Sequence, residues 1–100
     1  MKTYETVVLV DAKLDTENLD RELQKISDYI KNAGGQNVTL KKWGRKELAY
    51  NMAGHDWAYY NSFEFVAAGE TAQQLTSWLR INDIVVKFET HKVEQKEVAA

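Results

Sequence analysis

The clearest periodicity in the chain lies in residues 14–35, which read LDTENLDRELQKISDYIKNAGG. Apolar side chains recur there at intervals of three and four residues, at Leu19, Leu23, Ile26, Ile30 and Ala33. This spacing is typical of the buried stripe of an amphipathic helix. Asp15 is a favourable N-cap residue, and the glycines at 34–35 can end the helix because glycine adopts the left-handed conformation without a steric penalty. The stretch predicts a helix over residues 16–33.

The sequence on both sides of this helix is typical of β-strands. Residues 4–10 form a near-continuous apolar run, which predicts a central strand with a partly covered second face. Residues 36–44 and 48–52 predict extended segments separated by a polar break at 44–47, and residues 54–56 predict a turn. Residues 57–67 predict a long aromatic strand whose odd-numbered positions face the core.

A second helix and a last strand follow. Residues 71–74 match a capping box that begins at Thr71, and Asn82 can take the left-handed position after the helix. Residues 84–91 predict a strand with Ile84, Val86 and Phe88 on one face and Val85 on the other.

The order strand, helix, strand, strand, helix, strand is that of the ferredoxin-like βαββαβ plan. Right-handed crossovers place both helices on one face of a four-stranded antiparallel sheet and leave the other face uncovered. The predicted fold class is therefore α+β. We expect residues 1–93 to form a single domain and residues 94–100 to form a flexible tail.

The composition is that of an ordinary globular protein. The chain has 100 residues, of which 44% are hydrophobic and 28% charged, and it has no Cys and no Pro. Disulfides, thiolate metal sites and cysteine nucleophiles are therefore excluded. No apolar run approaches the roughly 20 residues that span a bilayer, and no signal peptide is visible, so we expect a cytoplasmic protein without membrane contact.

No sequence pattern predicts catalysis. The two histidines, His55 and His91, have no metal-ligand spacing. A nucleophile elbow, a phosphate-binding glycine loop and a dinucleotide fingerprint are all missing from the sequence. We therefore expect no enzyme activity, no metal, no cofactor and no small-molecule substrate.

The charge is unevenly distributed, although the formal net charge is only −2. Residues 11–30 contain six acids and three bases, whereas residues 41–46 contain four bases and no acid. These cations can meet phosphates, and Trp43 among them can stack on a base or anchor a protein partner. The alternative is a solubilising hairpin with Trp43 folded onto the core. We also expect the first-strand and last-strand residues Lys2, Tyr4, Lys87 and Lys92 to share the uncovered face.

Five motifs follow one another along the chain, and they are Tyr4-Glu5, Gly34-Gly35, the block WGRKELAY at 43–50, Tyr59-Tyr60 and LRIND at 79–83. Together they resemble the motifs of the bacterial small-subunit ribosomal protein S6 family. The resemblance covers about residues 1–93. It implies a ferredoxin-like fold and a structural role on the ribosome, in which the protein binds the central domain of small-subunit ribosomal RNA together with ribosomal protein S18.

The resemblance also implies functional residues. RNA contacts are implied at Lys2, Tyr4, Arg45, Lys46, Arg80, Lys87 and Lys92. We expect the apolar residues Trp43, Leu48, Tyr50 and Trp57 to form the contact with the partner protein. An acidic protein with few phosphate contacts should bind RNA weakly alone, so we expect the partner to supply much of the positive charge.

Three positions depart from the family pattern. Thr3 and Val86 stand where a basic residue is often found, and Asn51 replaces a common proline.

Two other functions stay open on the residues alone. One is a dimer that encloses a small ligand, as in some cofactor-free oxygenases, with Trp57, Tyr59, Tyr60 and His91 as pocket candidates. The other is a regulatory ligand-sensing domain.

Overall fold

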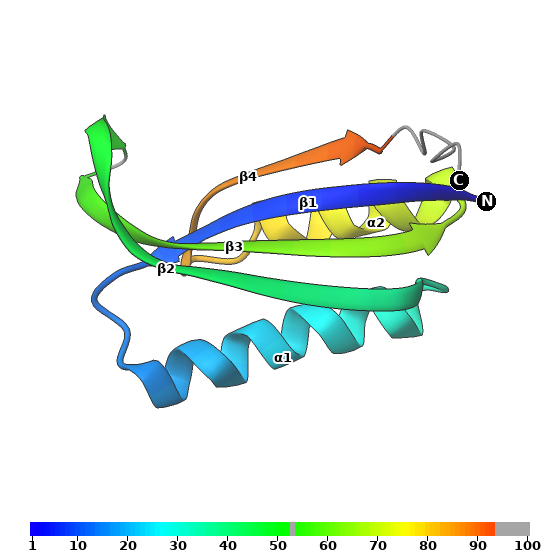
Figure 1. The fold of residues 1–100 in the computed structure, drawn as a ribbon, viewed down its shortest axis with the longest axis horizontal. Helices are drawn as coiled ribbons and strands as arrows, with labels where there is room; N and C mark the ends of the chain where they lie inside the picture. Colours follow the sequence, from blue (N-terminus) through cyan, green and yellow to red (C-terminus); the bar gives the residue numbers. More distant parts are fainter. Residues whose placement is uncertain (53, 94–100) are drawn as a thin grey trace, which may run out of the picture.

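The computed structural model describes residues 1–52 and 54–93. Its elements follow the order β1 (Lys2–Asp11), α1 (Thr16–Asn32), β2 (Gln36–Met52), β3 (His55–Ala67), α2 (Gly69–Arg80) and β4 (Val85–Lys92). The strands form one antiparallel sheet with the order β2-β3-β1-β4 (Figure 1). The predicted ferredoxin-like fold is confirmed. The expected flexible tail, residues 94–100, lies outside the described residues.

Strand β1 is central in the sheet and apolar on both faces. Val8 and Val10 are fully buried and pack with Phe63 and Phe65 of β3 beneath the helices. Val7 and Leu9 alternate with them and belong to a second, smaller cluster on the opposite face. This two-sided burial is the reason why the strand reads as a continuous apolar run.

The first helix has the predicted buried stripe and the predicted cap. Leu19, Leu23, Ile26 and Ile30 are all buried in α1. The Asp15 side chain accepts a hydrogen bond of 2.8 Å from the Asn18 N–H, which satisfies one of the free donors at the helix start. Leu75 and Leu79 of α2 join the same core, so both helices cover one face of the sheet (Figure 1).

The end of α1 requires glycine at two positions. Gly34 has a φ of +103°, and the Gly35 N–H donates a 2.8 Å hydrogen bond back to the Ile30 carbonyl. A Cβ atom at Gly35 would lie 2.4 Å from Ile30 Cγ2 and 2.8 Å from Ile30 O. Both contacts are too short, so the chain can turn this tightly out of α1 only without a side chain at residue 35.

The predicted start of α2 and the predicted left-handed cap at Asn82 are wrong, whereas Arg80 lies in the last turn as predicted. The helix begins at Gly69 with Ala68 as N-cap and no side-chain cap. Thr71 is buried instead, because its hydroxyl donates a 2.7 Å hydrogen bond to the Ala33 carbonyl at the end of α1. At the other end Ile81 is the C-cap with a φ of −95°, and the Asn82 side chain accepts from the Ile84 N–H rather than taking the left-handed position.

The second strand is continuous where a break was predicted. β2 runs through residues 44–47, and the pairing with β3 shifts register between Lys42 and Gly44. Gly44 has a φ of +85°, which is typical of a β-bulge. The bulge adds one residue to β2 without ending the strand. β3 also begins earlier than predicted, at His55, within the expected turn.

An extra residue in β4 changes the faces of this strand. Leu9 pairs with Lys87 and Val10 with Val85, so Val86 is the additional residue, and Val85 packs on the main core while Val86 packs on the opposite face. The predicted alternation reversed these two residues. Ile84 and Phe88 pack on the main core as predicted.

We expect Gly35→Ala to lower the free energy of unfolding by about 1–3 kcal/mol, because the added methyl group overlaps Ile30. Urea denaturation followed by circular dichroism measures this change. The matched control is Gly69→Ala, whose added Cβ would lie 3.7 Å from Tyr4 Oη, an ordinary contact. In this variant stability should stay unchanged or rise by up to about 1 kcal/mol, since Gly69 lies in a helix. Equal stability of the two variants would contradict the assigned role of Gly35.

Candidate functional site

The face of the sheet opposite the helices is held together by its own apolar cluster. Leu9, Leu48 and Ala58 are buried there, and Val7, Tyr60 and Val86 pack around them partly exposed. We call this side the open face, because α1 and α2 both pack on the other side (Figure 1). Its apolar centre is already sealed by side chains of the chain itself.

The bulge in β2 brings an aromatic residue and a cation together on the open face. Trp43 is 56% exposed, and its Nε1–H donates a 3.4 Å hydrogen bond to Ser62 Oγ. Lys46 Nζ lies 6.0 Å from the Trp43 ring centroid and 5.8 Å from that of Tyr60, within cation–π range. Residues 43 and 46 would point to opposite faces of a regular strand, since side chains alternate. The bulge therefore creates this group, the hairpin cluster of Trp43, Lys46 and Tyr60.

The other face of the same hairpin carries a second cation–aromatic pair. The Arg45 guanidinium carbon lies 4.7 Å from the centroid of Trp57, which is 39% exposed. Arg45 pairs with Tyr59, whose hydroxyl donates to the Leu14 carbonyl on the helix side. The predicted partner-contact residues are therefore not brought together. Trp43 and Leu48 lie on the open face, Trp57 lies on the opposite face, and the side chain of Tyr50 is outside the described part of the structure.

Three of the predicted RNA contacts lie at the far end of the sheet. Tyr4 on β1 and Lys92 on β4 are direct cross-strand neighbours. Lys2 lies two residues before Tyr4 and therefore on the same side of β1. The Tyr4 ring stacks on Phe65 of the core at a centroid distance of 5.8 Å. Lys2, Tyr4 and Lys92 thus lie on the helix side, and we call them the terminal edge. The expectation that they share the open face with Lys87 is wrong. Lys2 and Tyr4 alternate along β1 with the same period as Val8 and Val10, so they point to the helix side as those core residues do.

The remaining predicted RNA contacts lie towards the hairpin end. Lys87 is opposite Leu9 on the open face, and Arg80 is exposed in the last turn of α2. β1 spans about 30 Å between Lys2 and Asp11, at about 3.3 Å per residue. The predicted cations therefore do not form one patch. They form a small group at the terminal edge and a looser group around the hairpin.

The two amines at the terminal edge influence each other. A side-chain hydrogen bond with Lys92 and repulsion by its charge lower the pKa of Lys2 from its ordinary value. Two ammonium groups this close favour an anion between them, because an anion removes the repulsion and accepts hydrogen bonds from both.

The histidines and acids do not form a catalytic or metal centre. His55 Nδ1 lies 3.6 Å from Asp11 Oδ1, and His91 Nε2 lies 3.8 Å from Glu89 Oε2. Within residues 1–52 and 54–93, no three metal-ligating side chains cluster. The alternative ligand pocket is not assembled either, since Tyr59 faces the helices and Tyr60 the open face. No helix in the described part of the chain is long and apolar enough to cross a membrane.

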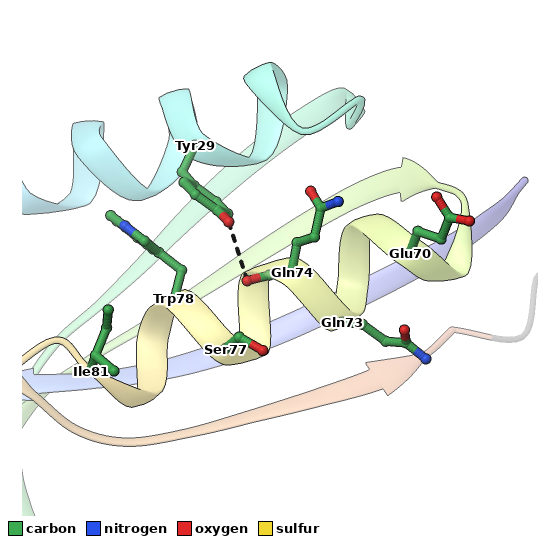
Figure 2. A pocket seen from close by; sticks show the side chains of 7 residues that line it. All are labelled: Tyr29, Glu70, Gln73, Gln74, Ser77, Trp78 and Ile81. Carbon is green, nitrogen blue, oxygen red and sulfur yellow. Dashed lines mark hydrogen bonds between the residues drawn. The ribbon is translucent and has the colours of Figure 1, made fainter.

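The helix layer carries a groove that sequence reasoning did not find. Figure 2 shows Tyr29 of α1 beside Trp78 of α2. The two rings are stacked, with their centroids 4.5 Å apart and an interplanar angle of 8°. The Tyr29 hydroxyl donates a 3.3 Å hydrogen bond to the Gln74 carbonyl. The groove has a volume of about 580 Å³. Trp78 directly precedes Leu79 in the sequence, so its position beside the Leu75–Leu79 stripe was predictable, but the stacked partner on α1 was not.

Comparison with known proteins identifies the family. Residues 3–92 match the family described as Ribosomal protein S6. The chain is 34% identical over 94 residues to small ribosomal subunit protein bS6 of Desulfitobacterium hafniense, covering 94% of this chain and 99% of that protein. It is 30% identical over 100 residues to the bS6 protein of Pseudarthrobacter chlorophenolicus, covering 100% of this chain and 99% of the relative.

A solved structure agrees with the fold. The crystal structure of 30S ribosomal protein S6 from Thermotoga maritima superimposes with a TM-score of 0.87 at 16% identity, covering 92% of this chain and 87% of that one. S6 proteins are non-enzymatic components of the small subunit of the cytoplasmic ribosome, which agrees with the expected absence of catalysis and the expected location. The matched residues, the sequence identity over nearly the whole chain and the shared fold together show that this chain belongs to the ribosomal protein S6 family.

Proposed function

We propose that this small-subunit protein binds the central domain of small-subunit ribosomal RNA together with ribosomal protein S18, and that the two partners meet different surfaces. The open face receives the partner protein, and the terminal edge of Lys2, Tyr4 and Lys92 contacts RNA phosphates. The observation that carries this proposal is the separation of an exposed tryptophan on the uncovered face from the cations at the opposite end of the sheet.

The partner surface is centred on Trp43. This residue is 56% exposed, yet its indole N–H donates to Ser62 and its ring lies near Lys46, so the side chain is held in place before any partner binds. Tryptophan is enriched among residues that dominate binding energy, and pre-ordering lowers the entropy lost on association. The partly exposed side chains of Val7, Tyr60 and Val86 continue the apolar surface beside it.

Leu48 supports this surface without offering much area of its own. It is 5% exposed and packs with Leu9 and Ala58. Its proposed contribution to partner binding is therefore indirect, through the position of β2 against β3. Tyr50 stays a proposed contact outside the described side chains, and Trp57 is reached only by a partner that wraps around the hairpin edge.

The RNA is contacted by cations at both ends of the sheet. Lys2, Tyr4 and Lys92 form one group, and the proposed contacts Arg45, Lys46, Arg80 and Lys87 surround the hairpin. With few cations at each end and a net charge of −2, phosphate neutralisation by this chain alone is limited. A positively charged partner seated on the open face lies between the two groups and supplies the missing charge.

We expect Trp43→Ala to weaken the affinity for ribosomal protein S18 about tenfold or more, a loss of about 1.4 kcal/mol. Isothermal titration calorimetry with the purified partner measures this loss, and circular dichroism verifies the fold. The matched control is Trp57→Ala, because Trp57 lies on the opposite face of the same hairpin. Leu48→Ala should instead lower the free energy of unfolding by about 2–5 kcal/mol, because it leaves a cavity.

The partner assignment has a clear contrary outcome. If Trp57→Ala weakens the affinity for the partner as much as Trp43→Ala does, the partner does not bind the open face. A stable homodimer in size-exclusion chromatography that ignores ribosomal RNA would instead support the ligand-enclosing dimer.

RNA affinity should fall as salt rises. Each neutralised phosphate contributes a slope of about 0.7–0.9 in log affinity against log salt concentration. We expect Lys2→Gln and Lys87→Gln each to reduce this slope by about that amount, as measured by filter binding to a central-domain RNA fragment in the presence of ribosomal protein S18. Affinity that does not change with salt would contradict phosphate neutralisation, and equal affinity with and without the partner would contradict shared charge.

A further inference from the structure

A second groove lies on the far side of α2 from the stacked rings, between this helix and the edge strand β4. Its volume is about 510 Å³. Its polar lining side chains come from β1, α2 and β4, and they are Tyr4, Gln73, Thr76, Ser77, Thr90 and Lys92. Figure 2 shows Gln73 extending from α2 towards β4, whereas Gln74 points to the Tyr29 side.

This groove continues into a smaller hollow at the end of the sheet. Lys92 lines both, and Lys2 and Thr3 line the smaller one, whose volume is about 270 Å³. The two hollows together form a strip that runs along α2 and ends at the two amines of the terminal edge. A strip of this kind suits an extended chain better than an enclosed small ligand.

The charge of the strip has one sign. Among the described residues, the lining of the two hollows includes Lys2 and Lys92 and no carboxylate. Glu70 belongs to the first turn of α2 and lines the groove beside Tyr29 and Trp78 (Figure 2), which shares Gln73 and Ser77 with the strip but not Lys2 or Lys92. The strip therefore favours an anion, whereas the opposite groove does not.

Hydrogen-bond donors accompany this charge. The hydroxyls of Tyr4 and Ser77 and the amide of Gln73 can each face a phosphate oxygen. The Thr76 hydroxyl instead donates to the Ala72 carbonyl, and the Thr90 hydroxyl is paired with that of Thr6. Gly69, the first residue of α2, also lines the groove, and the helix starts there without a side-chain cap. Phosphate groups are bound in proteins by this combination of fixed cations and neutral donors.

We propose that the strip between α2 and β4 holds a stretch of the ribosomal RNA backbone, with Lys2 and Lys92 on its phosphates and Gln73 and Ser77 of α2 as hydrogen-bond donors. This inference rests on the proposed RNA-binding function and deepens it. It makes α2, whose Gln73 and Ser77 no sequence pattern pointed to, part of the RNA-binding surface. The RNA then passes along the helix side of the sheet edge and leaves the open face to the protein partner.

The repulsion between Lys2 and Lys92 gives the proposal a local signature. Lys92 lowers the pKa of Lys2 in the free protein. A phosphate between the two amines stabilises both charges, so the pKa of Lys2 rises when RNA binds. An RNA bound elsewhere leaves this pKa unchanged.

Adjacent glutamines on α2 provide a matched pair of variants. Gln73→Glu adds a carboxylate beside β4, and Gln74→Glu adds the same charge to the same helix on the Tyr29 side. We expect Gln73→Glu to weaken binding of a central-domain ribosomal RNA fragment, in the presence of ribosomal protein S18, about fivefold at low salt. Gln74→Glu should leave the affinity unchanged, and NMR titration of the Lys2 side chain should show its pKa rise with RNA.

The outcomes separate the groove from the function. If the unaltered chain binds RNA and the two glutamate variants bind equally well, or equally poorly, the groove does not hold the RNA, although the proposed function stands. An unchanged Lys2 pKa on RNA binding overturns the groove and also the proposed phosphate contact of the terminal edge. If the unaltered chain with its partner does not bind the RNA at all, the proposed function fails, and this inference fails with it.

Discussion

The alternation of side chains along β1 is the constraint on which both surfaces of this molecule depend. Val8 and Val10 fill the core beneath the helices, while Val7 and Leu9 anchor the apolar cluster of the open face. Because the period of a strand is two residues, a shift of one residue would exchange these two sets. The same strand therefore fixes the helices on one side and holds the proposed docking surface on the other.

Much of the fold was predictable because local chemistry and tertiary packing agree. The Asp15 cap, the α1 stripe and the glycine turn at 34–35 are all confirmed, and each depends on contacts within a few residues. The start of α2 was not predictable in this way. The hydroxyl of Thr71 has the right spacing for a local cap, but it is used 38 residues away on the carbonyl of Ala33. A long-range hydrogen bond leaves no local signal.

The candidate site was harder to predict because bulges decide which side chains share a face. Gly44 was visible as a turn-forming residue, but its positive φ serves a bulge within β2, which places Trp43 and Lys46 together and turns Arg45 to the other side. In β4 the irregular pairing with β1 places Val85 on the main core instead of the predicted open face. Simple alternation counts residues, so one extra residue is enough to assign its neighbours to the wrong face.

The distribution of cations bears on how a weakly acidic chain takes part in an RNA assembly. A single basic patch would bind RNA without help, but here the terminal edge and the hairpin cations lie about 30 Å apart, the length of β1. Neither group alone neutralises many phosphates, and the acids of α1 add repulsion. In the proposed function, a partner seated between the groups would join them into one positive surface. The affinity for RNA would then depend on the protein complex, and assembly of the two proteins would precede RNA binding.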